Sequence, residues 1–356
     1  MADVARLAGV NASTVSHVVN GTRPVSDGTR EAVLRAIAQT GYRHNALARS
    51  LATSSTTTLG LASSISANPH FADLVRAVES AARAAGYTLL LGDTHDDAEQ
   101  ELRVVQELAD RRVDGVLLAP SPHAGERALP LLRAAGVPTV LVDRFTDDGL
   151  DQIAPENVEA TAALAGHLAD IGHTRVAMVV GMPGLHSSAE RLAGYRRTVA
   201  ERGLDDDPAL VVAGGSEPGR AAEAVAALFA RAGRPSAVVV GNNAMTIGTM
   251  RALRDLGLRV PDDVALACYD DFEWSDLFEP RLTAIAQDVP RMGARAVAMM
   301  LERIADPALP ARAERVVPAL RHRTSCGCRP GRAPRTTASD PGPVPVGTGG
   351  RGTLGA

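Results

Sequence analysis

The sequence predicts a small N-terminal all-α helix-turn-helix headpiece, followed by an α/β core of two doubly wound parallel-sheet subdomains. Two patterns predict this division. Short helical patterns around a glycine turn fill the first fifty residues, whereas strand-like apolar runs alternate with amphipathic helices from Leu59 onward. A polar run of serines and threonines at 54–58 separates them and indicates a domain boundary.

The headpiece pattern centres on residues 10–20, VNASTVSHVVN. Two short helices are predicted on either side of Gly9, which can adopt a positive φ at no steric cost. Apolar residues at helical spacing give each helix a buried side, formed by Val4, Leu7 and Ala8 in the first and by Val15, Val18 and Val19 in the second. Two helices joined by a short glycine turn describe a helix-turn-helix.

A third helix is predicted at 27–40, with Ser26 as its N-cap and Gly41 at its end. Its apolar side is expected to contain Val33, Leu34 and Ile37. The outer face of the second helix is polar and small-sided, with Asn11 as a candidate N-cap. Such a face suits a helix that enters the major groove, but it also suits a plain surface helix of a small bundle.

Charge is unevenly distributed along the chain, although its net value is only −4. All 37 basic side chains are arginine. Residues 1–52 contain six arginines and three acidic side chains, which gives +3, and the remainder carries −7. A mildly basic head on an acidic body is consistent with a head that faces phosphates.

The run DVARLAGVNASTVSHVVNG resembles the headpiece of the lactose-repressor (LacI/GalR) family of bacterial transcription regulators, and so does RPVSDGTREAVLRAIAQTGYRHNALARSLAT. The similarity extends over residues 3–323. It implies a ligand-responsive repressor that binds a pseudo-palindromic operator as a homodimer. The implied DNA-contacting positions are Asn11, Ala12, Ser13, Thr14, Ser16, His17, Asn20, Ser26, Thr29, Tyr42, Asn45, Ala48 and Leu51.

Two of these positions have specific implied roles. Leu51 lies in a short hinge helix at 46–52 and matches the leucine that wedges between base pairs in the minor groove. The alternative is a linker helix whose Leu51 packs on its own domain. His17 stands where many family members carry an arginine that reads guanine. A neutral histidine has one donor and one acceptor, so it either reads a base differently or contacts only phosphate.

The family headpiece also begins earlier, with a threonine three residues before the position of Asp3. We therefore expect Asp3 to cap the first helix alone and the natural start to lie upstream. The predicted domains are a headpiece at 1–45, a hinge helix and linker at 46–58, a two-lobed effector-binding and dimerisation core at 59–328, and a disordered tail at 329–356. The tail is rich in proline, glycine, serine and threonine and carries no leucine heptads.

In the core, alternating strands and helices indicate βα units, and the resemblance implies a periplasmic-binding-protein-like core. Strands are predicted at 59–65, 88–93, 115–119, 139–143, 175–181, 210–213, 237–241 and 265–270. Helices are predicted at 71–85, 98–111, 126–135, 158–171, 188–201, 220–232, 245–256 and 290–304. The chain is expected to cross between subdomains at 151–156, and 315–323 is expected to be the last strand.

Polar residues recur directly after the predicted strands, where a parallel α/β cleft would bind a ligand. These pairs are Ser63-Ser64, Asp143-Arg144, Asn242-Asn243 and Asp270-Asp271, to which the resemblance adds Phe71, Arg191 and Gln287-Asp288. The implied effector-binding residues are Ser64, Phe71, Asp143, Arg191, Asn242 and Asp270. They suit a small sugar-like ligand. Alternatively, some of these polar residues cap helices, as the positions of Ser187, Asn243 and Asp271 suggest.

Other functions have less support. No glycine-rich dinucleotide or P-loop fingerprint follows a strand, so no enzymatic activity, catalytic residue or cofactor is predicted. Cys326 and Cys328 could share a metal, but we expect reduced thiols and no metal, because no second Cys/His cluster is recognised nearby. The chain opens without an export signal, which predicts a cytoplasmic protein. The alternatives are a transport-type sugar-binding protein and a corepressor-dependent regulator that senses a purine-like metabolite.

Overall fold

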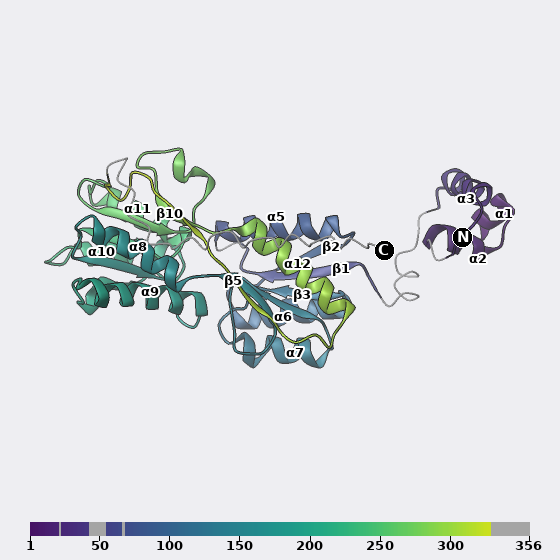
Figure 1. Cartoon of the computed structure of the whole chain (residues 1–356), viewed down its shortest axis with the longest axis horizontal. Coiled ribbons are helices and arrows are strands. Elements are labelled where there is room, and N and C mark those ends of the chain that lie inside the picture. The colour runs from purple at the N-terminus through teal and green to yellow at the C-terminus, as the bar shows by residue number, and fades with distance from the viewer. Residues whose placement is uncertain (21–22, 43–54, 66–67, 329–356) are drawn as a thin grey trace, which may run out of the picture. The chain divides into compact units, whose positions relative to one another are not determined.

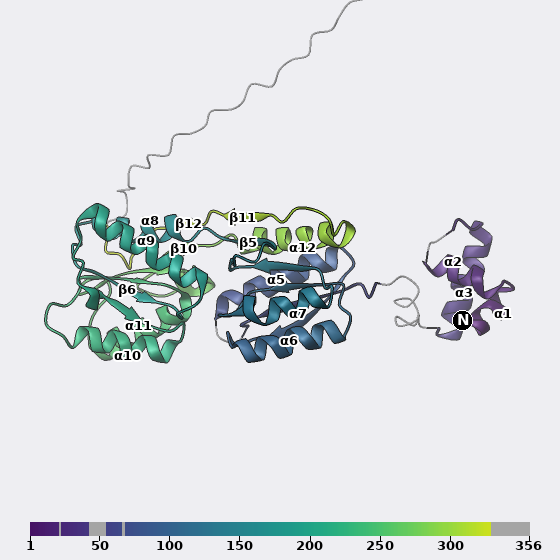
Figure 2. The same ribbon diagram turned by 90° about the horizontal axis from the view of Figure 1, so that it is seen from below.

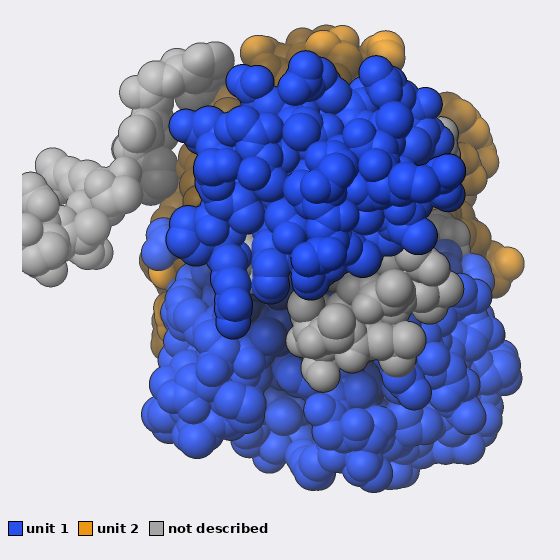
Figure 3. Space-filling view, turned by 90° about the vertical axis from the view of Figure 1, so that its right-hand side faces the viewer, with its two compact units in different colours: residues 1–67, 71–154, 289–316 blue, residues 68–70, 155–288, 317–356 orange. Residues whose placement is uncertain are grey.

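The computed structural model describes residues 1–20, 23–42, 55–65 and 68–328 (Figures 1 and 2). It contains a helical head and two compact α/β units, which Figure 3 distinguishes by colour. Unit 1 includes residues 71–154 and 289–316, and unit 2 includes residues 155–288 and the segment from Val317. Within the described ranges, no helix is long and apolar enough to cross a membrane.

The head consists of α1 (Ala2–Ala8), α2 (Ala12–Asn20) and α3 (Asp27–Thr40). One fully buried valine from each helix, namely Val4, Val15 and Val33, forms its core. Gly9 ends α1 with φ 67°, as the predicted turn requires. Ser26 caps α3 by accepting a hydrogen bond from the Thr29 backbone N–H at 3.3 Å.

Three expectations about the head are wrong. Leu7 and Leu34 are 53% and 54% exposed, and Ala5 and Ala36 fill the positions beside the valines instead. Small alanine side chains allow helices this short to approach closely, and the leucines remain outside. Asp3 does not cap α1: the N-cap is Met1, whose side chain makes no capping bond, and the Asp3 carboxylate pairs with Arg6 at 2.7 Å.

Unit 1 contains a six-stranded sheet with the order β11-β5-β4-β3-β1-β2. Each of β1 to β5 is parallel to its neighbours among these five. The strands are β1 (Thr58–Ser63), β2 (Thr88–Asp93), β3 (Gly115–Leu118), β4 (Thr139–Val142), β5 (Asp151–Pro155) and β11 (Ala313–Val316). Side chains from α5 (Pro69–Ala84) and α12 (Val289–Ala305) form one apolar cluster with this sheet, and those from α6 (Ala98–Asp110), η1 (Ala124–Glu126) and α7 (Ala128–Ala134) form another.

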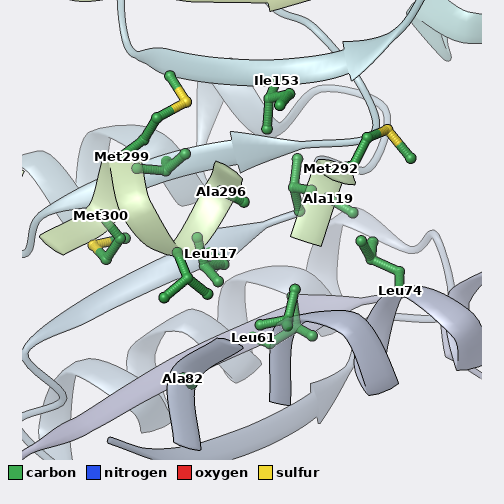
Figure 4. Close-up of a cluster of buried hydrophobic side chains, with 14 of the residues drawn as sticks. Leu61, Leu74, Ala82, Leu117, Ala119, Ile153, Met292, Ala296, Met299 and Met300 are labelled. Carbon is green, nitrogen blue, oxygen red and sulfur yellow. The ribbon is translucent and has the colours of Figure 1, made fainter. Parts of the chain in front are cut away.

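The first of these clusters shows why a helix from the end of the chain belongs to unit 1. In Figure 4, Met292, Ala296 and Met299 of α12 lie among Leu61, Leu117 and Ile153 of the sheet. All six side chains are at most 1% exposed. At about 25 cal/mol per Å² of buried apolar surface, such packing contributes several kcal/mol, so α12 is a structural part of this core.

Unit 2 has the equivalent strand order β12-β10-β9-β8-β6-β7. The strands are β6 (Val176–Val180), β7 (Val211–Ala213), β8 (Ala237–Val240), β9 (Ala265–Tyr269), β10 (Thr283–Ala286) and β12 (Ala319–Arg321). One face packs against α8 (Val158–Asp170) and α9 (His186–Arg202), the other against α10 (Pro218–Phe229) and α11 (Asn243–Asp255). Two short 3₁₀ turns complete the unit, η2 (Pro208–Leu210) and η3 (Glu273–Asp276).

The predicted α/β alternation is confirmed, with four differences in detail. The crossing segment forms β5, and β10 was not predicted. The predicted helix at 126–135 is divided into η1 and α7. The single strand expected at 315–323 is two strands, β11 in the first sheet and β12 in the second. Pro318 lies between them and has no N–H to donate to a strand ladder, so one continuous strand is disfavoured there.

Candidate DNA-binding head and effector-binding residues

The residues expected to contact DNA on α2 and just before it are less buried than Val15, the buried valine of this helix. Asn11, Ala12 and Ser13 are exposed, and Thr14, Ser16 and His17 are half-buried. The Asn11 carbonyl accepts a hydrogen bond from the Val15 N–H at 3.1 Å, so the helix begins where predicted. Small side chains at the exposed start of a helix allow its backbone to approach a partner surface closely, as a recognition helix must.

Three other predicted DNA contacts have structural roles within the head. The Ser26 hydroxyl bonds both the backbone N–H and the hydroxyl of Thr29, so this pair fixes the start of α3. Tyr42 packs against the valine core. Asn45, Ala48 and Leu51, together with the hinge helix and the tail, lie outside the described residues, as does the side chain of Asn20.

In unit 1, the residues after β4 form a buried charged group. Asp143 follows the strand directly, with φ 72°, and is 5% exposed. The neighbouring Arg144 binds the Asp96 carboxylate with two guanidinium nitrogens and the Pro120 carbonyl at 3.1 Å. Its guanidinium carbon also lies 5.2 Å from the centroid of the Phe71 ring, within the range of a cation–π contact. Burial disfavours the charged arginine, but Asp96 outweighs it, and the pKa of Arg144 is raised.

The same end of this sheet carries buried polar atoms that have no hydrogen-bond partner among the described residues. They are the hydroxyls of Ser63, Ser64, Thr94 and Ser121, Oε1 of Glu101 and Nε of Arg144. The serine, threonine and arginine residues of this group lie at the end of β1 or just after β1, β2, β3 or β4. Glu101 instead projects from α6 and accepts a hydrogen bond from the Ser121 N–H at 2.6 Å. Buried polar groups are normally paired, so this group is prepared for hydrogen bonds from water or a ligand.

In unit 2, Arg191 is held in a fixed orientation on α9. Its Nε donates to Asn157 Oδ1 at 2.9 Å, and one terminal nitrogen donates to the Gly241 carbonyl at 2.6 Å. The guanidinium carbon lies 3.6 Å from the centroid of the Tyr269 ring. Arg191 is 9% exposed, so a forked, stacked cation is positioned beside the carboxyl ends of β8 and β9.

Asp270 follows β9 as Asp143 follows β4, and its φ of 76° is also positive. Its carboxylate accepts from the Asn243 N–H at 3.3 Å and from the Gln287 side-chain amide at 2.5 Å. The side-chain oxygens of Asn243 and Gln287 are buried and have no partner in the part of the chain that the structure describes. Left-handed backbone at a residue other than glycine is uncommon, and it occurs here at the equivalent point of both sheets, the carboxyl end of the fourth strand.

The proposed helix-cap roles are wrong for all three residues named. Asn242 caps α11, since its side-chain oxygen accepts from the Met245 N–H at 2.8 Å, and Asn243 is the first residue of that helix. Ser187 lies inside α9, whose N-cap is Leu185. Asp271 forms a two-pronged ion pair with Arg323, at 2.8 and 2.9 Å. The first two errors arise because α9 and α11 each begin two residues earlier than predicted, at His186 and Asn243. The short helix after Asp271 begins later, at Glu273, with Phe272 as its N-cap.

Asp114 anchors the described residues of the linker, 55–57, to unit 1. Its carboxylate accepts from the Ser55 hydroxyl at 2.5 Å, from the Thr56 N–H at 2.7 Å and from the Thr57 N–H at 3.0 Å. The Thr56 hydroxyl adds a further bond to it at 2.8 Å. One carboxylate therefore fixes the three consecutive residues that precede β1.

Sequence reasoning missed three residues that organise these groups: Asp96, Glu101 and Tyr269. For Glu101 a signal was present, because it shares its helix face with Val104, Val105 and Leu108, and a charged residue on an apolar stripe marks a buried polar site. Burial raises its pKa to about 7, against the opposing effects of the hydrogen bond from the Ser121 N–H and of Arg144. No comparable sequence signal distinguishes Tyr269 from an ordinary core residue of β9.

The expectation that no Cys/His cluster lies near Cys326 and Cys328 is also wrong. Folding brings His167 of α8 and His322 of the segment after β12 to Cys328. Spacing in the sequence could not reveal this arrangement, because His167 is more than 150 residues away along the chain. Cys268 stays apart from this group, in the cluster on the opposite face of the sheet.

Comparison with known proteins places these observations in a family. The model of the lacI family of bacterial regulatory proteins matches residues 1–45, and that of the periplasmic binding protein-like domain matches residues 165–326. The ribose operon repressor of Escherichia coli K12 is 37% identical over 327 residues, covering 91% of this chain and 99% of its own. The chain belongs to the lacI family of bacterial regulatory proteins.

Further relatives agree with this membership. The HTH-type transcriptional repressor PurR of Vibrio campbellii is 38% identical over 305 residues, which cover 85% of this chain and 91% of that protein. Among solved structures, the Lac repressor dimer bound to operator and the anti-inducer ONPF has a TM-score of 0.82 at 28% identity. The complex of the transcriptional regulator CelR with cellobiose has a TM-score of 0.69 at 31% identity. Both cover 91% of this chain and 98% of their own.

This lacI-family protein is therefore a ligand-responsive, DNA-binding transcriptional regulator and not an enzyme. Glu156 precedes α8, and its carboxylate accepts hydrogen bonds from the Glu159 and Ala160 N–H groups at 2.9 and 2.8 Å. This side chain therefore satisfies two donors of the helix N-terminus.

Proposed function

We propose that this lacI-family regulator is a repressor that binds a pseudo-palindromic operator as a homodimer in the bacterial cytoplasm. A small sugar-like effector controls it by binding two conformations of the core unequally. In this proposal, residues 1–45 read DNA, 46–58 form the hinge helix and linker, and 59–328 form the dimerising effector-binding core.

The DNA-binding part of the proposal rests on α2. Its outward residues are small or rich in hydrogen-bonding groups, and Asn11, Ala12 and Ser13 are exposed at its start. Two heads related by two-fold symmetry would read the two halves of an inverted repeat. The Lac repressor, to which the chain is similar, has been solved as a dimer on its operator. Leu51 is proposed as the minor-groove wedge.

The effector part of the proposal rests on the unpaired polar atoms at the strand ends of each unit. We assign effector contacts to Ser64, Phe71, Asp143, Arg191, Asn242 and Asp270. Hydroxyls without partners, acidic acceptors and a forked guanidinium suit the many hydroxyls of a sugar. The relative CelR has been solved with cellobiose. A purine-like corepressor is the second candidate, because the Tyr269 and Phe71 rings lie beside the polar groups.

A gel-shift assay on the gene's own upstream region tests the proposal. The purified chain should bind an inverted repeat there, and the affinity should fall steeply as salt is raised. Members of a panel of mono- and disaccharides should weaken or strengthen that binding, and purine bases form the second arm of the panel. Binding that ignores DNA sequence, or that no metabolite alters, would contradict the proposal.

A further inference from the structure

The segment after β12 carries a group of thiols and imidazoles that the regulatory function does not use. One ring nitrogen each of His167 and His322 and the Cys328 thiol all lie within 4.8 Å of one another. The Cys326 thiol is 3.0 Å from that of Cys328. The two histidine rings meet edge to face, with centroids 4.3 Å apart.

Burial distinguishes this group from a chance surface cluster. Cys326 is fully buried and His167 is 5% exposed, whereas His322 is exposed and Cys328 is half-buried. The Nε2 atom of His167 is buried and has no hydrogen-bond partner among the described residues. An unpaired buried imidazole nitrogen is costly unless something binds it, and the exposed side of the group leaves a route from solvent.

Ser325 and Gly327 hold the loop that carries the thiols. Ser325 is tied to the sheet on both sides, because its hydroxyl donates to the Leu266 carbonyl at 2.7 Å and accepts from the Thr283 N–H at 2.8 Å. Gly327, between the two cysteines, has φ 76°, a left-handed conformation that lets two thiols turn toward the same point. The loop therefore holds its thiols in place before any ligand arrives.

We propose that His167, His322, Cys326 and Cys328 form a zinc site. Two thiolates and two imidazoles are a common ligand set of tetrahedral structural zinc. With Zn–S near 2.3 Å and Zn–N near 2.0 Å, the ligand atoms of a tetrahedral site lie about 3–4 Å apart. The atoms of His167, His322 and Cys328, all within 4.8 Å of one another, are close to that spacing, and Cys326 is the fourth ligand because its thiol lies 3.0 Å from that of Cys328. The ion would join α8 to the segment after β12 and complete the packing of unit 2.

Zinc content and cobalt spectroscopy test this site on the full chain, purified under reducing conditions without a polyhistidine tag. The wild-type chain should bind one zinc per chain. Co²⁺ in its place should give an intense visible spectrum of tetrahedral type and a thiolate-to-cobalt band in the near ultraviolet. Zinc should also raise the unfolding temperature, and a chelator should lower it again.

Matched variants make the result specific. His322→Ala and Cys328→Ala should weaken zinc affinity about tenfold or more and abolish the thiolate band, because each removes a ligand. His173→Ala and Cys268→Ala should leave the zinc affinity and the thiolate band unchanged. The reason is that His173 forms a hydrogen bond with Ser236, and Cys268 lies on the other face of the sheet. Zinc binding that survives in the first two variants would be adventitious and would overturn the proposal. So would a reduced chain that binds no zinc, or one whose Cys326 and Cys328 form a disulfide equally fast with zinc present.

Discussion

The Arg191 guanidinium lies over the Tyr269 ring, with 3.6 Å between the guanidinium carbon and the ring centroid. Two hydrogen bonds, to Asn157 and to the Gly241 carbonyl, prevent it from turning away. The guanidinium is therefore held on its face by the Tyr269 ring and on its edge by hydrogen bonds. A group fixed in this way needs little reorganisation to bind a ligand. Lysine would keep the charge but lose both the fork and the stacking.

Arg191→Lys should therefore abolish the response to effector while leaving effector-free operator binding unchanged. We also expect the free energy of unfolding to fall by about 1–3 kcal/mol, because buried acceptors lose their donor. Gel shifts with and without the active metabolite, together with urea unfolding, measure both effects. Arg196→Lys, an exposed change on the same helix, is the control. An undiminished response would remove Arg191 from the effector-binding residues.

His17→Ala should weaken binding to the specific operator and spare effector binding. A lost base contact costs about 1–2 kcal/mol, which is roughly a 5- to 30-fold loss of affinity. Gel shifts against the operator and against a scrambled duplex separate the two possible roles of His17. If affinity falls equally for both duplexes, His17 contacts only phosphate. Gln39→Ala, on the exposed side of α3, is the matched control.

The stability of the chain should fall between about pH 4.5 and pH 7 because of Glu101. Burial raises the folded pKa of this carboxyl from 4.5 to about 7, although the hydrogen bond from the Ser121 N–H and the charge of Arg144 lower it and Asp96 raises it further. The folded state therefore retains a proton that the unfolded state releases. Its stabilising contribution is complete below pH 4.5, declines as pH rises to 7, and is lost above that, by up to about 3 kcal/mol.

Glu101→Gln should remove this pH dependence, because the amide is neutral and its oxygen can still accept from the Ser121 N–H. Urea unfolding at pH 5 and pH 8 measures the difference between the two proteins. The variant should be more stable than the wild type at pH 8 and similar to it at pH 5. Glu107→Gln, exposed on the same helix, should leave the pH profile as it is. Identical profiles for wild type and Glu101→Gln would contradict the assignment.

Asp114→Ala should release the start of β1 from unit 1. The Thr56 and Thr57 N–H groups lose their acceptor, so their hydrogen exchange should become at least about tenfold faster, as expected for local opening. Exchange measured by mass spectrometry on peptides covering 55–60 tests this, with Asp110→Ala as an exposed control nearby. Unchanged exchange would mean that the strand ladder alone holds this segment. If the segment transmits the effector signal, repression by the variant should also become less sensitive to effector.

Much of the architecture was predictable, because it depends on periodicity. The glycine turn at Gly9, the cap at Ser26 and the alternating strands and helices all follow local rules. Which side chains pack against one another does not follow from local rules. Leu7 and Leu34 occupy apolar positions of their helices yet remain exposed, since helices this short bury only the side that faces the other two. Neither residue could be assigned without knowing how the three helices cross.

Some of the polar residues of the candidate site could likewise be predicted from the sequence, and others could not. Asp143 and Asp270 were recognisable because they directly follow apolar strands. The Asn157 contact to Arg191 joins residues 34 positions apart, and the Cys326 group joins a helix to the end of the chain. Such contacts between distant segments leave no spacing in the sequence from which they could be read. Glu101 is the exception, since a carboxylate on an apolar helix face marks its own burial.

The discontinuous path of the chain through unit 1 affects how the protein is made. Synthesis proceeds from the N-terminus, so residues 155–288 of unit 2 leave the ribosome before α12 and β11, which complete unit 1. Until then the sheet face that later receives Met292 and Met299 is uncovered. A chain that stops before Val316 contains neither unit whole. Slow translation or early termination within unit 2 therefore exposes a large apolar surface to chaperones and to aggregation.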